Sequence, residues 1–232
     1  MIKYLQLPFH FDASLMQQEI RLLEKTNWQL HYQVKHYEGE WSALPLRSTS
    51  GKADDIIISP VDGAAYHDTE LLQQCPYLKE ILSFFHCPLL AVRLLKLNAG
   101  AVIKEHRDAE LYFEKGEIRI HIPVKTNDRV EFYLDNERIL LKEGECWYMN
   151  FNLPHRISNN SKEERIHLVI DAMANDWVKE LFAQPGLVKK EIADPQMDAA
   201  TQQQVIAQLR SLNTETASRL ADEMEKGLKF EV

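Results

Sequence analysis

The order of apolar and polar residues divides the chain into a short helical start, a long stretch of strands and a helical end. Residues 12–26 carry apolar side chains at helical spacing, and Asp12 is placed to cap the first turn. Residues 69–86 favour one or two short helices that are separated at Pro76. From about residue 90 the segments become short and rich in Ile, Val, Leu and aromatic residues, which is typical of strands.

Turn residues such as those in TND, DNE and NNS separate the apolar segments of the central stretch. This spacing favours a mainly β protein with helices, whose core is a sandwich or jelly roll. The expected strands read LLAVRLLKL, EIRIHIPVK, RVEFYLD, RILLKEG, ECWYMNF and ERIHLVIDA. Beyond Asp171 the pattern becomes helical again. We therefore expect one unit at 1–172, with the N-terminal helices and the β core, and a C-terminal helical annex at 173–232.

Composition narrows the partners that the chain is suited to bind. Its net charge of −8 gives no reason to expect nucleic acid or an acidic membrane surface. No apolar run reaches the ~18–20 residues that span a bilayer, and the N-terminal residues lack the pattern of a signal peptide. The cysteines form no CxxC motif and favour reduced packing thiols; they are Cys75, Cys87 and Cys146. We therefore expect a cytoplasmic protein, and the amphipathic annex leaves an oligomer possible.

Three pairs in the chain consist of a histidine followed two positions later by an acidic residue. They are His10/Asp12, His36/Glu38 and His106/Asp108. Nine histidines and 35 acidic residues in a chain of 232 predict about 1.4 such pairs by chance. The spelling of a pair therefore decides nothing. Asp12 has a capping role and His36 lies in the polar run KHYEGE, so these two pairs are expected to serve no metal.

His106 and Asp108 differ from the other pairs in their setting. On an expected strand, residues two apart face the same way, so both side chains can reach one point. His155, in NLPHRISNN, follows a later strand that can lie opposite in a jelly roll. Two imidazoles and one carboxylate on one face of an octahedron are typical of non-haem Fe(II) oxygenases. Taken alone, His155 is better explained as a hydrogen-bonded, inert loop histidine after Pro154.

Two expected strands each carry an arginine and a histidine on the same face, as Arg119/His121 and Arg165/His167. Aliphatic residues occupy the other face of both strands, so charged groups point into an otherwise covered interior. A buried guanidinium requires an anionic partner, and its fork binds a carboxylate at two points. The pattern predicts a dicarboxylate that also chelates a metal. The alternatives are structural salt bridges to acidic residues on neighbouring strands and, for His167, a hydrogen-bonded core histidine.

As an ordered set, these segments resemble the aspartyl/asparaginyl β-hydroxylase family of Fe(II)/2-oxoglutarate-dependent dioxygenases. The resemblance covers roughly residues 40–172 and rests on EWSALPLRS, GAVIKEHRD, RIHIPVKTND, EGECWYMNFNLPHRISNNS and RIHLVIDA. The animal membrane-bound members have Gly in place of Asp108, and a serine of theirs that contacts the cosubstrate aligns with Leu95. The chain is therefore more similar to the soluble bacterial members, such as proline 3-hydroxylase.

The resemblance implies a double-stranded β-helix as the catalytic domain, with Fe(II), the cosubstrate 2-oxoglutarate and O2. It also implies hydroxylation of an unactivated C–H bond with release of succinate and CO2. By motif position, the metal ligands would be His106, Asp108 and His155. The residues that would contact 2-oxoglutarate are Arg165 at its distal carboxylate, and His121 and Arg119 near its chelating end or near substrate.

The substrate expected from the sequence is a small free amino acid, proline-like first, or a peptidyl side chain. An α-carboxylate suits an arginine, and the candidates for binding substrate are Arg47, Arg93 and Trp147. Two other functions compete with this one. A cupin-like metal enzyme that does not use 2-oxoglutarate has no need for Arg165. A non-catalytic ligand-binding β-barrel has no need for three metal-ligating side chains to converge.

Overall fold

The computed structural model describes residues 1–58, 63–192 and 199–228. The chain divides into two compact units, Met1–Ile192 and Ala193–Val232. The second unit is a helical hairpin of α5 (Ala199–Ser211) and α6 (Glu215–Leu228). Its helices are joined by ion pairs from Arg210 to Asp222 and Glu225. Among the helices of the described residues, none has the length and apolar character to cross a membrane.

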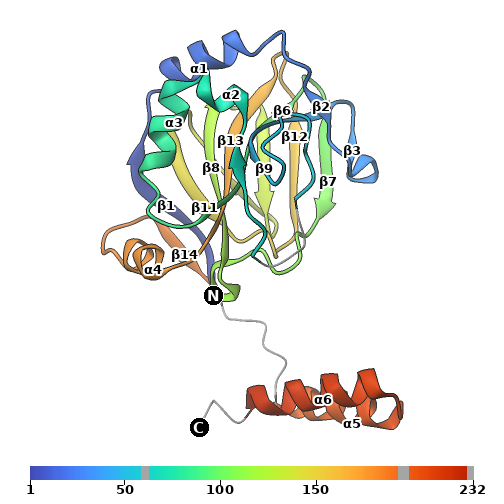
Figure 1. The fold of residues 1–232 in the computed structure, drawn as a ribbon. Helices are drawn as coiled ribbons and strands as arrows, with labels where there is room; N and C mark the ends of the chain where they lie inside the picture. The colour runs from blue at the N-terminus through green and yellow to red at the C-terminus, as the bar shows by residue number, and fades with distance from the viewer. Residues whose placement is uncertain (59–62, 193–198, 229–232) are drawn as a thin grey trace. The chain divides into compact units, whose positions relative to one another are not determined.

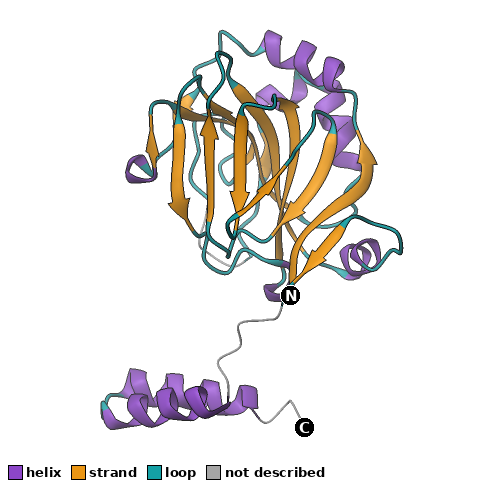
Figure 2. Ribbon diagram, turned by 180° about the vertical axis from the view of Figure 1, so that it is seen from behind, coloured by secondary structure: helices purple, strands orange, loops and turns teal. Residues whose placement is uncertain are grey.

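The first unit contains two antiparallel sheets, which form the two layers seen in Figures 1 and 2. In spatial order the larger sheet contains β14 (Lys189–Glu191), β1 (Ile2–His10), β11 (Glu145–Met149), β8 (Glu117–Lys125), β13 (Arg165–Met173), β6 (Leu89–Leu97), β4 (Trp41–Ser48) and β2 (Gln29–Leu30), with β5 (His67–Asp68) paired to β4. The smaller sheet contains β10 (Glu137–Ile139), β9 (Val130–Leu134), β12 (His155–Asn159), β7 (Val102–His106) and β3 (Tyr37–Glu38). This is the expected jelly-roll core, built from two separate sheets rather than one closed barrel.

The helices of the first unit pack against the larger sheet. They are α1 (Ala13–Leu22), α2 (Glu70–Gln73), α3 (Pro76–Ser83) and α4 (Asp176–Phe182), with short 3-10 turns at Val34–His36 and Phe113–Lys115. Asp12 caps α1 as the sequence predicts, because its carboxylate accepts the backbone N–H groups of Ser14 and Leu15. The predicted break at Pro76 is also confirmed, since this proline begins α3.

The strict alternation of β8 and β13 gives the larger sheet two different faces. Their aliphatic residues join an apolar core with α1, α2 and α3; from these two strands they include Ile118, Ile120, Ile122, Ile166, Leu168 and Ile170. Val169 lies on the opposite face, in a second core shared with the smaller sheet. The same face as Val169, called the inner face here, also carries the residues that alternate with the aliphatic ones: Arg119, His121, Arg165 and His167. The predicted orientation of the two strands is confirmed.

Strand β1 was not anticipated from the sequence. It pairs with β11 on one side and with β14 on the other. The end of β1 is held by Gly144, whose carbonyl accepts the Phe11 backbone N–H at 2.9 Å. Gly144 has φ of +81°, and a Cβ there would lie 2.3 Å from the Phe11 carbonyl oxygen, so only glycine fits.

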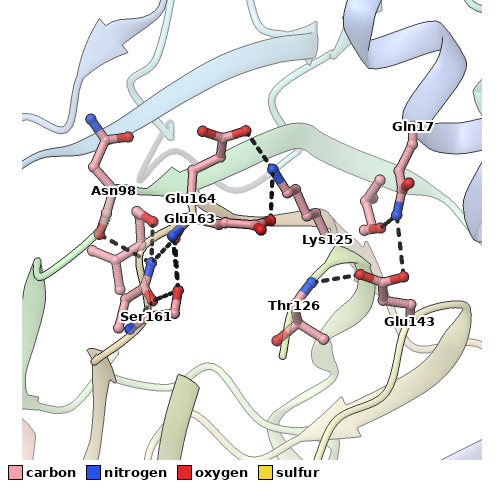
Figure 3. A network of polar contacts seen from close by, with 11 residues as sticks. Gln17, Asn98, Lys125, Thr126, Glu143, Ser161, Glu163 and Glu164 are labelled. Atoms are coloured by element: carbon pink, nitrogen blue, oxygen red, sulfur yellow. Dashed lines mark hydrogen bonds and ion pairs between the residues drawn. The ribbon is translucent and has the colours of Figure 1, made fainter. Parts of the chain in front are cut away.

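A polar network fixes the turns that lead into β13 (Figure 3). Lys125, at the end of β8, pairs with Glu163 and Glu164. The side-chain amide of Asn159 donates to three backbone carbonyls, those of Leu97, Asn98 and Glu163. These contacts join the ends of β6, β8 and β12 directly before Arg165, the first residue of β13. These contacts therefore help to fix the backbone directly before Arg165.

Candidate active site

Three side chains that could hold a metal ion meet at one end of the smaller sheet. His106 ends β7, His155 begins β12, and the two are paired directly across these strands. Asp108 lies in the loop beyond β7 rather than on the strand, and its backbone N–H donates to the Phe151 carbonyl at 2.9 Å. One ligand atom from each of the three residues lies within 4.8 Å of the others. The structure therefore brings together the three residues that the sequence nominated as metal ligands.

Backbone carbonyls orient both imidazoles. Nδ1 of His106 lies 2.7 Å from the carbonyl oxygen of Lys104, and Nδ1 of His155 lies 3.0 Å from that of Leu153. A carbonyl oxygen only accepts, so each Nδ1 carries the hydrogen and each Nε2 keeps its lone pair. The lone pairs of the two Nε2 atoms are thus the ones that can bind a metal ion. Such outer contacts usually orient metal-binding histidines.

Arg119 orients the carboxylate of the set. Its Nη1 pairs with Oδ2 of Asp108, while Oδ1 lies 3.8 Å from Nε2 of His106. Burial works to raise the pKa of Asp108, but Arg119, then His155 and His106, outweigh it and hold that pKa below its ordinary value. Burial lowers the pKa of His155 to about 4. At neutral pH the set therefore offers an ionised carboxylate oxygen beside a neutral imidazole.

A buried acid, Asp171, joins two of the candidate arginines. Its carboxylate is inaccessible to solvent and accepts from Nη2 of Arg93 and Nη2 of Arg119, each at 3.0 Å, and from Nε of Arg119. For Arg119 these pairs match the structural salt bridges that were the alternative interpretation. Sequence reasoning missed Asp171, although one more step of the alternation through Arg165, His167 and Val169 reaches it.

Arg165 is buried, at 2% exposure, and its surroundings differ from those of Arg119. Within the part of the chain that the structure describes, no Asp or Glu pairs with it and its Nε has no partner. Its Nη2 lies 2.7 Å from Nδ1 of His167, which in turn lies 3.2 Å from Nδ1 of His121. Burial lowers the pKa of Arg165 to about 9. The guanidinium is therefore a cation in need of an anion.

Two cavities meet at His106 and Asp108. An inner cavity of about 40 Å³ is lined by His106, Asp108, His155, Arg119, His121 and Arg165, together with apolar side chains. An outer cavity of about 280 Å³ shares His106, Asp108, Arg119 and Trp41 with it and adds His31 and Arg93. The metal-ligand set therefore faces Arg165 on one side and a wider polar space on the other.

The remaining candidates lie elsewhere. Arg47 pairs with Asp68 and lines neither cavity among the residues described. Trp147 is buried against Tyr4 and donates its Nε1–H to Glu145 at 2.9 Å. It does not contribute to the walls of either cavity.

Two histidines near the site were not anticipated. The ring of His31 stacks on Trp41 at 3.5 Å between centroids, and both line the outer cavity. The ring of His36 lies 5.0 Å from that of His106, so a pair expected at the surface places its histidine beside the site. Its acidic member, Glu38, pairs instead with Lys104. No periodicity in the surrounding polar sequence marks either histidine.

Comparisons with known proteins give the following likenesses. A family model described as aspartyl/asparaginyl beta-hydroxylase matches residues 11–175. L-proline cis-4-hydroxylase of Rhizobium meliloti (strain 1021) is 26% identical over 195 residues, which cover 81% of this chain and 68% of that protein. L-proline cis-3-hydroxylase 1 of Streptomyces sp is 28% identical over 152 residues, covering 62% of this chain and 52% of that protein. This chain thus spans about two thirds of the first relative and about half of the second.

A solved structure described as an oxidoreductase of the 2OG-Fe(II) oxygenase family, from Burkholderia pseudomallei, also matches. It is 14% identical, with a TM-score of 0.49, and the match covers 75% of this chain and 88% of that one.

Proposed function

The chain belongs to the aspartyl/asparaginyl β-hydroxylase family, and from that premise we propose that it is an Fe(II)- and 2-oxoglutarate-dependent dioxygenase that hydroxylates a free, proline-like amino acid. One observation carries the proposal. A single cavity is lined both by two histidines and an aspartate and by a buried arginine that has no acidic partner among the described residues. A 2-oxo diacid, which chelates metal at one end and carries a carboxylate at the other, satisfies both groups at once.

The donor set fits Fe(II). His106 and His155 each present a free Nε2, and Asp108 presents one carboxylate oxygen because Arg119 occupies the other. Two imidazoles and one carboxylate leave positions open for further ligands, which is typical of non-haem Fe(II) oxygenases. A structural zinc site would instead be closed by a fourth protein ligand.

The buried polar atoms fit 2-oxoglutarate. Within the described chain, Nε of Arg165, Nε2 of His121 and Nε2 of His167 are buried without a hydrogen-bond partner. Arg165 and His121 line the inner cavity, and buried polar atoms are normally paired, so their two unpaired nitrogens support a missing polar ligand. Arg165 carries the charge that a distal carboxylate requires. A cupin-like enzyme without 2-oxoglutarate has no use for such a guanidinium, which favours the oxygenase.

The residues divide the reaction between them. When bound, Fe(II) with 2-oxoglutarate and O2 supplies the oxidising chemistry that replaces a C–H hydrogen by hydroxyl, with succinate and CO2 as the other products. His106, Asp108 and His155 hold one face of the metal and leave the other to ligands. Arg165 fixes the far end of the cosubstrate. The apolar walls of the inner cavity, which include Phe151, limit the access of water.

Substrate binding is assigned to the outer cavity. Arg93 lines it, and Nε of Arg93 is buried with no acceptor among the described residues, so it is free to bind an α-carboxylate. The stacked rings of His31 and Trp41 provide a flat wall for a small ring. The named activities of two relatives, both acting on proline, support a proline-like substrate. We therefore assign substrate recognition to Arg93 rather than to Arg47 or Trp147.

All residues proposed for the site lie within the first unit, so one copy of the chain suffices for it. The three cysteines are free thiols, two of them buried. Free thiols suit a reducing compartment that also supplies free amino acids. We therefore assign the enzyme to the cytoplasm.

The proposal is tested by product analysis with purified protein, Fe(II), ascorbate and 2-oxoglutarate. The substrates are proline, its six-membered homologue pipecolic acid, and prolinamide as a matched compound without the carboxylate. We expect proline to give succinate together with a product that carries one added oxygen atom, and prolinamide to give neither above background. Hydroxylation without 2-oxoglutarate, or no oxygenated product from any small amino acid, would overturn the proposal.

A further inference from the structure

Resting on the proposed function, we propose that His167 is a positioning residue that orients Arg165 for the distal carboxylate, and so makes the site select a dicarboxylate cosubstrate. His167 is buried, at 1% exposure, and lies on the same face of β13 as Arg165. Its Nδ1 is 2.7 Å from Nη2 of Arg165. Neither the metal nor the substrate pocket needs this contact, because His167 lines neither the inner nor the outer cavity.

The direction of the hydrogen bond follows from the donor. An arginine N–H only donates, so Nδ1 of His167 accepts and the ring hydrogen is on Nε2. Burial, and then the charge of Arg165, hold the pKa of His167 well below its ordinary value. The ring is therefore neutral and its lone pair is available to the guanidinium. His121 is placed to donate its Nδ1–H to the same lone pair, at 3.2 Å.

A comparison with Arg119 shows why an imidazole rather than a carboxylate stands beside Arg165. Arg119 is held by Asp108 and Asp171, so its charge is already neutralised. His167 fixes one arm of Arg165 without adding a negative charge, because a neutral imidazole accepts a hydrogen bond and carries no charge. The charge of Arg165 thus stays oriented and uncompensated. A guanidinium in that state is prepared to bind an incoming carboxylate with little reorganisation.

Apart from His121, His167 has no second polar partner beside Arg165 within the described residues. Its Nε2 is buried without a partner, and the small cavity that it lines with Arg165 has mostly apolar walls, among them Val130, Phe132 and Ile139. The stretch of β13 around it is paired on both sides, with His167 opposite Pro123 of β8 and Leu95 of β6. Substitutions of His167 therefore act mainly on Arg165 and on His121.

The test compares three variants that differ in where they place an acceptor. His167→Asn keeps an oxygen near the position of Nδ1, His167→Gln moves it toward the position of Nε2, and His167→Leu removes it. The ligands are 2-oxoglutarate and 2-oxopentanoate, which has the same chain length and chelating group but a methyl in place of the distal carboxylate. Equilibrium binding to the Fe(II)-loaded protein is measured anaerobically by calorimetry.

We expect His167→Leu and His167→Gln to weaken 2-oxoglutarate binding by about 10- to 100-fold, the loss typical of a hydrogen bond to a charged group. His167→Asn should stay within about fivefold of the unaltered protein, and 2-oxopentanoate should bind all four proteins about equally. If His167→Leu does not fold, the contrast between Asn and Gln carries the same comparison. Equal losses for both ligands, or no difference between Asn and Gln, would overturn the role of His167.

Failure of the proposed function gives a different result. In that case the unaltered protein with Fe(II) would bind 2-oxoglutarate no better than 2-oxopentanoate, and Arg165→Ala would change neither affinity. A dependence on Arg165 that is present while the three His167 variants all bind 2-oxoglutarate normally would reject only the inference about His167.

Discussion

Replacing Asp171 by Asn should be among the most damaging single changes in the strands that carry the site, although Asp171 contacts neither proposed metal nor cosubstrate. Its carboxylate is completely buried and bridges the guanidiniums of Arg93 and Arg119. Asparagine keeps the size of the side chain but offers a single acceptor oxygen. Its amide NH2 then faces a guanidinium, and two buried cations lose their shared counterion.

The size of the effect follows from the contacts. Removing one partner of a buried ion pair costs about 3–5 kcal/mol, because it leaves a buried charge uncompensated. The Asp171 carboxylate accepts three hydrogen bonds from two guanidiniums, which places the loss at the upper end, about 4–5 kcal/mol. In a domain of about 150–250 residues, 1 kcal/mol shifts Tm by about 2–4 °C. We therefore expect Tm to fall by about 8–20 °C.

The assay is thermal unfolding followed by circular dichroism, with Asp176→Asn as the matched control. Asp176 undergoes the same chemical change on the exposed first turn of α4, where it pairs with Lys179, and the Tm of this variant should not differ measurably from that of the unaltered protein. Because Arg119 also holds Asp108, Asp171→Asn should weaken Fe(II) binding as well. A Tm for Asp171→Asn that equals that of the control would refute the idea that this carboxylate neutralises both arginines.

His106→Ala and Asp108→Ala should each abolish succinate formation and keep the circular dichroism spectrum. The control His10→Ala, from a pair outside the site, should leave turnover unchanged. Loss of activity in His10→Ala would contradict the assignment of the three pairs. Arg165→Ala should raise the KM for 2-oxoglutarate about 100-fold with Fe(II) affinity largely kept, in line with the loss of a charge-assisted pair. An unchanged KM would move the anchoring role elsewhere. Burial lowers the pKa of His31 to about 3 and holds those of His121 and His167 well below the ordinary value. Histidines of the unfolded chain titrate near 6.5, so below that pH the unfolded chain binds more protons than the folded one. The free energy of unfolding of the metal-free protein should therefore fall by up to ~1.4 kcal/mol per histidine for each pH unit from about 6.5 toward 4. Urea unfolding at pH 7.5, 6 and 5 measures this, and a flat profile would contradict the neutral burial of these rings.

The inner face of the larger sheet could be predicted from the sequence because a strand has a fixed period of two. That period places Arg119 with His121 and Arg165 with His167 on one face, whatever the rest of the fold does. The capping role of Asp12 was likewise local, since a helix start depends on its own first turn. The convergence of His106 and His155 needed only the pairing of β7 with β12, which the jelly-roll interpretation implied.

Features that depend on distant partners were not predictable in the same way. Strand β1 carries a proline and a buried Lys3, which forms ion pairs with Asp135 and Glu137 of the β9–β10 hairpin. Nothing local shows that this lysine has a buried partner. For the same reason the pairing of Asp171 with both Arg93 and Arg119 stayed hidden, because three strands must align before the carboxylate reaches the two guanidiniums.

The stack of His31 on Trp41 illustrates the same limit at the substrate side of the site. His31 follows the two-residue strand β2, and Trp41 begins β4, so their contact depends on how the chain between them turns. The sequence showed Trp41 within a family motif but gave no reason to place a histidine ring against it. The walls of the outer cavity therefore come from tertiary structure, while the metal-ligand set comes from motif and strand register.

An anaerobic titration of the protein with Fe(II) and 2-oxoglutarate tests the central claim most directly. Chelation of the metal by a 2-oxo acid gives a visible charge-transfer band, so absorption reports both partners together. We predict a band that requires both Fe(II) and 2-oxoglutarate, persists in His10→Ala and is lost in Asp108→Ala. Absence of the band in folded, unaltered protein, or an undiminished band in Asp108→Ala, would contradict the account.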